Sequence, residues 1–327
     1  MCPKIYPKDP WEKAEYVPVR VRALLDLVRP FTLLPPLIGG IAGALMALAS
    51  EGSIEGASVS ASYPFIQLSR PVLYPLLTGV SALVFLNAAS NALNQVYDLE
   101  IDRVNKPYRP LPSGIYTREE ALWISFLLYL FSFWRAAVVG AVFFSLVLLI
   151  AIFTVLYSVP PFRLKKRLWI SNISIAIPRG LLGIVASWSI FGDVTDPVPW
   201  AIGSVMALYL VGSTTTKDLT DVEGDRLYGV RTLPVVYGKK RAITLSLPFF
   251  LLPSLFTLLY TWEGIFPLEA LYLGVVLIPW GAAVAYLLAR EGDRPDEHFE
   301  NSPAWRHMYI MLMGQVSPTR RGERPLR

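Results

Sequence analysis

Long apolar segments, separated by short polar connections, make up most of this chain. Eight segments carry few charged residues and end close to polar or proline-containing turns: 31–50, 72–97, 119–134, 137–158, 168–191, 197–217, 243–262 and 266–289. About 20 apolar residues in a helix cross a hydrocarbon core roughly 30 Å thick. We therefore predict an all-α, polytopic membrane bundle with these eight spans. A ninth apolar segment, 303–317, is shorter and a weaker candidate.

The composition supports a membrane protein. Of the 327 residues, 54% are hydrophobic and 17% are charged, and the mean hydropathy is +0.45. Soluble domains carry roughly 25% charged residues. The first 20 residues lack the apolar core of a signal peptide. We predict a polar N-terminal segment (1–20), one transmembrane domain (21–317) and a basic tail (318–327). The single cysteine, Cys2, excludes an internal disulfide and a cysteine-based metal cage.

Lysine and arginine alternate between the two sides of the predicted bundle. They are concentrated in the first 30 residues and in the connections 98–120, 163–167 and 217–241, whereas the intervening connections carry mainly acids. The positive-inside rule places the basic connections on the cytoplasmic side of the membrane. We expect this membrane to be the cell membrane. The net charge of +5 is thereby explained by topology, without a nucleic-acid partner. The arginines of the tail favour the cytoplasm too, whereas a ninth span would put the tail outside.

Two of the basic connections begin with the same acidic motif. "DLEIDRVNKPYRPLPSG" starts at Asp98 and "DVEGDRLYGVRTLPVVYG" starts at Asp221, so each opens D-x-E-x-D-R. An arginine follows at Arg109 or Arg231, and a proline three residues later. This similarity indicates an internal duplication.

The spacing of the acids predicts two rows of oxygen ligands. At 3.6 residues per turn, residues three or four apart share one helix face. The first row is Asn94, Asp98 and Asp102, and Asn87 and Asn91 extend it into the membrane; the second row is Asp218, Asp221 and Asp225. The intervening Glu100 and Glu223 point elsewhere and are expected to pair with nearby arginines. Solvated charges at a helix end are the alternative interpretation, but two matched motifs weaken it.

Hard oxygen ligands of this kind suit Mg²⁺, which is usually held by one or two carboxylates together with substrate phosphates. Two facing rows could hold two or more Mg²⁺ ions against a diphosphate and help it leave. Basic residues near the rows could bind the same diphosphate: Arg29, Arg109, Arg163, Lys165 and Lys217. Asn91 and Tyr157 are further candidates for binding the substrates. A diphosphate at the bilayer suggests an isoprenoid, and its allylic cation could be stabilised by the rings of Tyr97 or Tyr157.

Arg179 lies in the middle of the apolar segment 168–191, where an unpaired charge is costly. It is either a paired structural charge or a contact for the acceptor or the diphosphate.

These motifs resemble those of the UbiA-type intramembrane prenyltransferases. "NQVYDLEIDRVNKPYRPLPSG" is similar to the first aspartate-rich motif of that family and "KDLTDVEGDRLYGVRTLPVVYG" to the second. The resemblance implies nine helices around a central cavity, Mg²⁺ and a polyprenyl diphosphate at the two motifs, and prenyl transfer to a lipophilic acceptor. By position, Asn94 and the four catalytic acids match the family's ligands: Asp98, Asp102, Asp221 and Asp225. Asp218 fits by geometry.

Two points of the resemblance stay open. The family's Tyr-x-x-x-Lys element is not reproduced after Tyr157, so either Arg163 or Lys165 could bind phosphate. The motif forms are similar to the homogentisate and chlorophyll-type branches, so the expected acceptor is an aromatic quinone precursor. They are also similar to archaeal enzymes that alkylate geranylgeranylglyceryl phosphate, and this lipid is the alternative acceptor. A transporter with an ion site is the alternative from another class, although transporter sites usually lie near the midplane.

Overall fold

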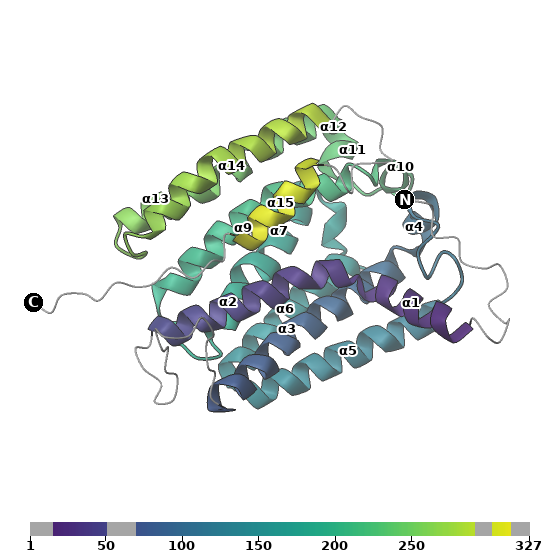
Figure 1. Ribbon diagram of the computed structural model, residues 1–327. Coiled ribbons are helices and arrows are strands. Elements are labelled where there is room, and N and C mark those ends of the chain that lie inside the picture. The colour runs from purple at the N-terminus through teal and green to yellow at the C-terminus, as the bar shows by residue number, and fades with distance from the viewer. Residues whose placement is uncertain (1–15, 51–69, 292–302, 315–327) are drawn as a thin grey trace, which may run out of the picture.

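The computed structural model describes residues 16–50, 70–291 and 303–314, and this part of the chain is built from helices without a β-strand (Figure 1). Eight helical segments are long and apolar enough to cross a membrane. Six contain a single long α-helix: α2 (Leu34–Ser50, after η1, Pro30–Leu33), α3 (Arg70–Tyr97), α5 (Arg118–Val139), α6 (Ala141–Ser158), α9 (Pro197–Asp218) and α14 (Ala270–Glu291). The predicted all-α membrane bundle and its eight main spans are confirmed, and the chain is an integral membrane protein.

Two spans are interrupted. In one, α7 (Leu168–Ala176) and α8 (Leu182–Trp188) flank a π-helical turn, η3 (Ile177–Leu181). In the other, α12 (Lys239–Ser246) and α13 (Leu252–Trp262) flank the 3₁₀ turn η4 (Leu247–Phe250). Each interruption contains a proline, whose missing N–H and ring prevent a regular helix. Pro178 and Pro248 are these residues.

Short helices complete the described part of the chain: α1 (Tyr16–Val28), α4 (Leu99–Asn105), η2 (Leu164–Lys166), α10 (Val222–Leu227), α11 (Leu233–Tyr237) and α15 (Pro303–Gly314). Helices α4 and α10 lie together at one end of the bundle (Figure 1). Residues 1–15 of the predicted N-terminal segment, including Cys2, and the predicted tail 318–327 lie outside the described residues.

Helix α15 corresponds to the predicted ninth span. Its 12 described residues cover about 18 Å, which is less than the roughly 30 Å of a hydrocarbon core. It packs against α14, α2 and α9, and the Tyr209 hydroxyl donates a hydrogen bond of 2.6 Å to the Met308 carbonyl. A ninth crossing of the membrane therefore stays a prediction, whereas α15 as part of the bundle is observed.

Local chemistry fixes where several helices begin and end. Thr117 and Glu120 form a reciprocal capping box at the start of α5. Gly140, with φ of 153°, separates α5 from α6, which makes the tight turn between these spans. Asp196 caps the start of α9, and Pro197 occupies the first helical position. These signals set the lengths of the spans that carry the site.

Helices α3 and α5 form an extensive contact, and small hydroxyl residues lie in it. Ser125 and Ser132 of α5 are buried and donate hydrogen bonds of 2.9 and 2.8 Å to the carbonyls of Ala89 and Ala82 on α3. Small residues let membrane helices approach closely, and interhelical hydrogen bonds hold them there. These hydrogen bonds fix the middle of α3 against α5.

Candidate active site

Both acidic motifs start at a break in a membrane helix, and the aspartate before each following helix has nearly the same backbone conformation, although the second break is longer. Helix α3 ends at Tyr97 and α4 begins after Asp98, whose φ and ψ are −101° and 6°. Helix α9 ends at Asp218 and α10 begins after Asp221, at −107° and 9°. The duplicated sequence motif therefore corresponds to a duplicated local structure. Because α4 and α10 are in contact, the two motifs face one another at one end of the bundle.

In the first motif, each aspartate is held by basic side chains. Asp98 forms an ion pair with Lys165 and lies 3.4 Å from an Arg163 guanidinium nitrogen. Asp102 receives two hydrogen bonds, of 2.7 and 2.8 Å, from one nitrogen of Arg109. Burial raises the pKa of Asp102, and Arg109 only partly offsets this effect. Arg109 is thus paired with Asp102, and its predicted role in binding substrate stays a prediction.

The second motif is less completely paired. Lys106, from the first motif, lies 2.6 Å from the Asp221 carboxylate; burial raises the pKa of Asp221, but Lys106 and Arg109 outweigh it and leave the pKa below its ordinary value. Asp218 lies 3.8 Å from the Lys217 ammonium. Asp225 is 6% exposed and has no hydrogen bond or ion pair with its side chain in the described part of the chain. Burial, together with Asp218 and Asp221, raises the pKa of Asp225 to about 7.

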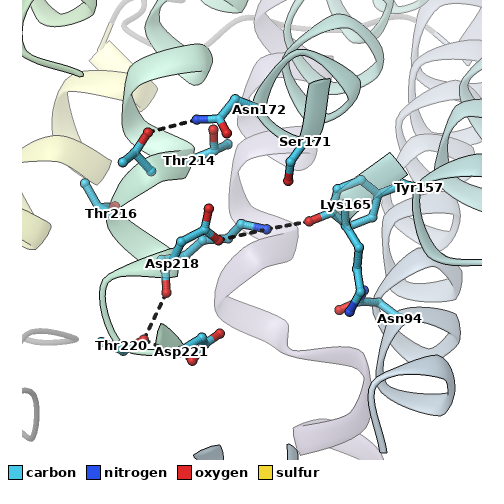
Figure 2. Close-up of polar contacts among 12 residues, drawn as sticks. Asn94, Tyr157, Lys165, Ser171, Asn172, Thr214, Thr216, Asp218, Thr220 and Asp221 are labelled. Atoms are coloured by element: carbon cyan, nitrogen blue, oxygen red, sulfur yellow. Dashed lines mark hydrogen bonds and ion pairs between the residues drawn. The ribbon is translucent and has the colours of Figure 1, made fainter. Parts of the chain in front are cut away.

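A cavity of about 240 Å³ opens beside the acids and extends into the bundle. Its polar wall includes Asn94, Tyr157 and Lys217, and the Lys217 ammonium donates a hydrogen bond of 2.7 Å to the Tyr157 hydroxyl. Figure 2 shows Asp218 and Asp221 on one side of this region and Asn94, Lys165 and Tyr157 on the other. Further in, the wall is mainly apolar, with side chains from α2, α3, α6, α8, α9 and α15: Pro35, Leu83, Leu86, Ile150, Ile184, Met206 and Leu312.

The amide row of α3 has a structural role beside the cavity. Asn91, predicted to bind substrate, lines the cavity but donates hydrogen bonds to the Val28 carbonyl (2.9 Å) and the Thr32 hydroxyl (2.8 Å). Asn87 likewise donates to the Thr32 carbonyl in η1, and Gln95 donates to the Leu27 carbonyl at the end of α1. Arg29 joins these two helices and lines the cavity in a left-handed conformation with φ of 57°. The row therefore holds Arg29 in an unfavourable backbone conformation.

Arg179 projects into the same cavity from the π-helical turn η3. Its side chain is exposed within the cavity and makes no hydrogen bond or ion pair with the described residues. A π turn shifts the direction of the side chains that follow it, and such turns are frequent at functional sites. Gly180, next to it, lies against α9, where an added Cβ would come within 2.7 Å of the Ala207 backbone. Of the two interpretations of Arg179, the paired structural charge does not hold in the described part of the chain.

Two of the residues considered in the sequence lie outside the site. Glu100 pairs with Arg103 at 2.8 Å on the surface, as expected, and so stays out of the site. Tyr97 does not line the cavity; its ring lies 5.7 Å from the Arg118 guanidinium.

Two residues of the site, Asn105 and Lys106, were not predicted from the sequence. The basic character of Lys106 was a usable signal, because it lies between the acidic motif and Arg109.

The donor set fits a hard divalent cation. The predicted ligands offer carboxylate and amide oxygens, and Asp225 lies unpaired, within the described part of the chain, beside two further acids. In the described part of the chain, no three histidine, cysteine, aspartate or glutamate side chains are close enough to hold an ion by themselves. Substrate oxygens and water would have to complete the coordination, which is the usual arrangement for Mg²⁺.

Comparison with known proteins identifies the family. The profile of the UbiA prenyltransferase family matches residues 58–301. The chain belongs to this family. It is therefore a prenyltransferase, and the alternative of an ion-coupled transporter is not favoured.

Relatives and solved structures agree with this assignment. A digeranylgeranylglyceryl phosphate synthase of Methanothermobacter thermautotrophicus is 33% identical over 71% of this chain and 87% of its own length. A chloroplastic chlorophyll synthase of Arabidopsis thaliana is 27% identical over 67% of this chain and 54% of its own. The fold is similar to that of a UbiA homolog from Archaeoglobus fulgidus bound to DMAPP and Mg²⁺, with a TM-score of 0.67 at 20% identity, over 89% and 97% of the two chains.

Proposed function

We propose that this prenyltransferase uses Mg²⁺ to transfer a prenyl group from a polyprenyl diphosphate, such as geranylgeranyl diphosphate, to a lipophilic acceptor in the membrane. One observation carries the proposal: two matched acidic motifs meet beside a cavity that is polar at their end and apolar further in. The Archaeoglobus fulgidus homolog, which holds DMAPP and Mg²⁺, supports the same assignment.

The proposed ligands follow from the positions of the side chains. Asn94 and the acids Asp98, Asp102, Asp218, Asp221 and Asp225 are the candidate ligands of Mg²⁺. Bound Mg²⁺ would neutralise the diphosphate and help it to leave. Lys217 and Arg163 are the candidate donors to the diphosphate oxygens, because Lys217 lines the cavity and the buried Nε of Arg163 has no hydrogen-bond partner.

The cavity then has two tasks during transfer. Its apolar wall encloses the prenyl chain and keeps water away from the allylic cation. The Tyr157 ring lies on the cavity wall between the acids and the apolar part, where an aromatic face stabilises a cation. Lys217 stays on the diphosphate side, since its ammonium is fixed by the Tyr157 hydroxyl at 2.7 Å.

The acceptor that we propose first is a phosphate-bearing lipid of the geranylgeranylglyceryl phosphate type. Arg179 supports it, because an unpaired guanidinium inside a membrane cavity suits an anionic group. The similarity to digeranylgeranylglyceryl phosphate synthases supports it as well. An aromatic quinone precursor, predicted from the form of the first motif, is the second candidate, and the similarity to chlorophyll synthases keeps it in the comparison.

The proposed orientation places the acidic motifs on the cytoplasmic side of the cell membrane. Lys106, Arg163 and Lys165 lie at the motif end of the bundle, whereas Asp193 and Glu263 lie in connections at the ends of α8 and α13 away from it. Basic residues are retained on the cytoplasmic side. Labelling of single cysteines introduced into each connection tests this orientation in intact cells.

The function is tested with purified protein in lipid vesicles. Donors of several chain lengths are combined with geranylgeranylglyceryl phosphate or an aromatic quinone precursor, and products are identified by mass spectrometry. We expect diphosphate release that requires Mg²⁺, and its loss in Asp98→Asn and Asp221→Asn. Glu100→Gln, in the same motif but paired on the surface, is the matched control and should stay active. Activity that survives both aspartate substitutions, or no release with any donor, contradicts the proposal.

A further inference from the structure

The two acidic motifs are joined by one side chain, that of Asn105 at the end of α4. Its Nδ2 donates a hydrogen bond of 3.0 Å to the Asp221 carbonyl, and its Oδ1 accepts one of 2.9 Å from the Gly224 backbone N–H. Residues 116 and 119 positions further along the chain are thereby bonded to a single amide. The bonded backbone includes that of Asp221, one of the candidate metal ligands.

The Gly224 N–H is the donor that the Asp221 side chain would normally take. Asp221 is the N-cap residue of α10, and Gly224 occupies the third helical position. An aspartate at an N-cap usually accepts a hydrogen bond from the N–H of the second or third helical residue. The Asp221 side chain makes no such bond, since its ψ of 9° lies outside the extended region of a capping residue, and the equivalent Asp98, with ψ of 6°, makes none either. Asn105 supplies the cap of α10 from the opposite motif. The Asp221 carboxylate is instead turned toward Lys106, 2.6 Å away.

The glycine in the second motif is explained by the same contact. A Cβ added at Gly224 would lie 2.6 to 2.8 Å from the amide atoms of Asn105, closer than real Cβ atoms approach other atoms. The first motif has Ile101 at the equivalent third helical position, where no side chain crosses over. The glycine of D-V-E-G-D, which replaces the isoleucine of D-L-E-I-D, thus leaves room for the Asn105 side chain.

We propose that Asn105 is a positioning residue, which caps α10 from the opposite motif, bonds the Asp221 carbonyl and so holds the Asp221 carboxylate where it can bind Mg²⁺. The inference rests on the proposed function, in that Asp221 is a metal ligand. Asn105 touches neither cation nor substrate; it acts through Asp221. When Asn105 is removed, the start of α10 loses both hydrogen bonds to the first motif, and the Asp221 carboxylate is no longer held at the metal site.

The test compares Asn105→Ala with Asn172→Ala. Asn172 is a buried amide that also bonds a backbone carbonyl and a side chain across two helices, with distances of 2.8 Å to Val211 and Thr215, but it joins α7 to α9. Mn²⁺ serves as the probe, and its binding is measured by electron paramagnetic resonance with inorganic pyrophosphate present. We expect Asn105→Ala to weaken Mn²⁺ binding about 10- to 100-fold, as substitutions behind a metal ligand commonly do, and Asn172→Ala to leave it unchanged.

A double-mutant cycle identifies the path of the effect. If Asn105 acts through Asp221, Asp221→Asn weakens Mn²⁺ binding strongly in the wild-type chain but little in Asn105→Ala. Additive effects, wild-type binding in Asn105→Ala, or equal losses in both asparagine variants overturn the proposal. Thermal unfolding of each variant shows whether it is folded. If Asn105→Ala does not fold, Asn105→Asp is used in its place. This variant keeps the capping oxygen, so Asp221→Asn should still weaken its Mn²⁺ binding strongly. A wild-type chain without Mg²⁺-dependent diphosphate release contradicts the proposed function instead.

Discussion

The buried ion pair of Asp102 and Arg109 allows the effect of Asp102 on stability to be measured separately from its predicted role as a metal ligand. The two side chains are 6% and 13% exposed and are joined by hydrogen bonds of 2.7 and 2.8 Å. Burial is the main cause of the raised pKa of Asp102. The attraction to Arg109 therefore does not fully offset the free-energy cost of desolvating the carboxylate. Removing only Arg109, by Arg109→Met, leaves that carboxylate buried and uncompensated, at a cost of about 3–5 kcal/mol.

Neutralising both partners should therefore restore stability. Replacing a buried pair by uncharged groups of similar size is often neutral or stabilising. We expect Arg109→Met and Asp102→Asn each to lower the unfolding temperature in detergent, and the double variant to regain most of the loss. Diphosphate release should remain low in the double variant, because Asp102 is also a predicted ligand of Mg²⁺. Additive destabilisation in the double variant would refute the reasoning about the pair, and full activity would remove Asp102 from the ligand set.

Four further substitutions test the cavity. Lys217→Met should raise the KM for the donor about 10-fold while Tyr157→Phe raises it less, because only the first removes a charge from the diphosphate site; equal effects contradict this assignment. Arg179→Gln should raise the KM for an anionic acceptor and leave that for the donor unchanged, whereas a change confined to the donor would place Arg179 at the diphosphate. Asn91→Ala should lower the free energy of unfolding by about 1–3 kcal/mol, through two lost hydrogen bonds, as followed by thermal unfolding; an unchanged unfolding temperature would show that the amide does not hold the segment carrying Arg29.

The membrane spans were predictable because the bilayer imposes one simple requirement. A spanning helix must satisfy its own backbone hydrogen bonds and be apolar over about 20 residues, so hydropathy alone locates it. The 12-residue α15 does not meet that requirement in its described part, and its place in the bundle depends on tertiary contacts such as the bond between Tyr209 and Met308. Sequence periodicity does not predict such tertiary contacts.

The site was predictable in its residue types and less so in its partners. The spacing of Asn94, Asp98 and Asp102 indicated one helix face, yet the helix breaks at Asp98, and a bend of this kind has no propensity signal. Arg109 follows Asp102 by seven residues, so their pairing depends on how the intervening turn folds. The role of Asn105 was invisible within its own motif. Comparison of the two motifs offered a clue, because glycine replaces isoleucine where the amide arrives.

The near balance of opposite charges around the two motifs has a consequence for how ligands bind. Asp98, Asp102, Asp218 and Asp221 lie in ion pairs with basic residues, and Asp225 is without one in the described part of the chain. The basic partners are Lys106, Arg109, Arg163, Lys165 and Lys217. A cation alone must compete with the ammonium and guanidinium groups for the acids, and a diphosphate alone must compete with the acids for those groups. Bound together, the two ligands satisfy both sets. Each should therefore raise the affinity for the other by the same factor, a reciprocal cooperativity that needs no movement of the helices.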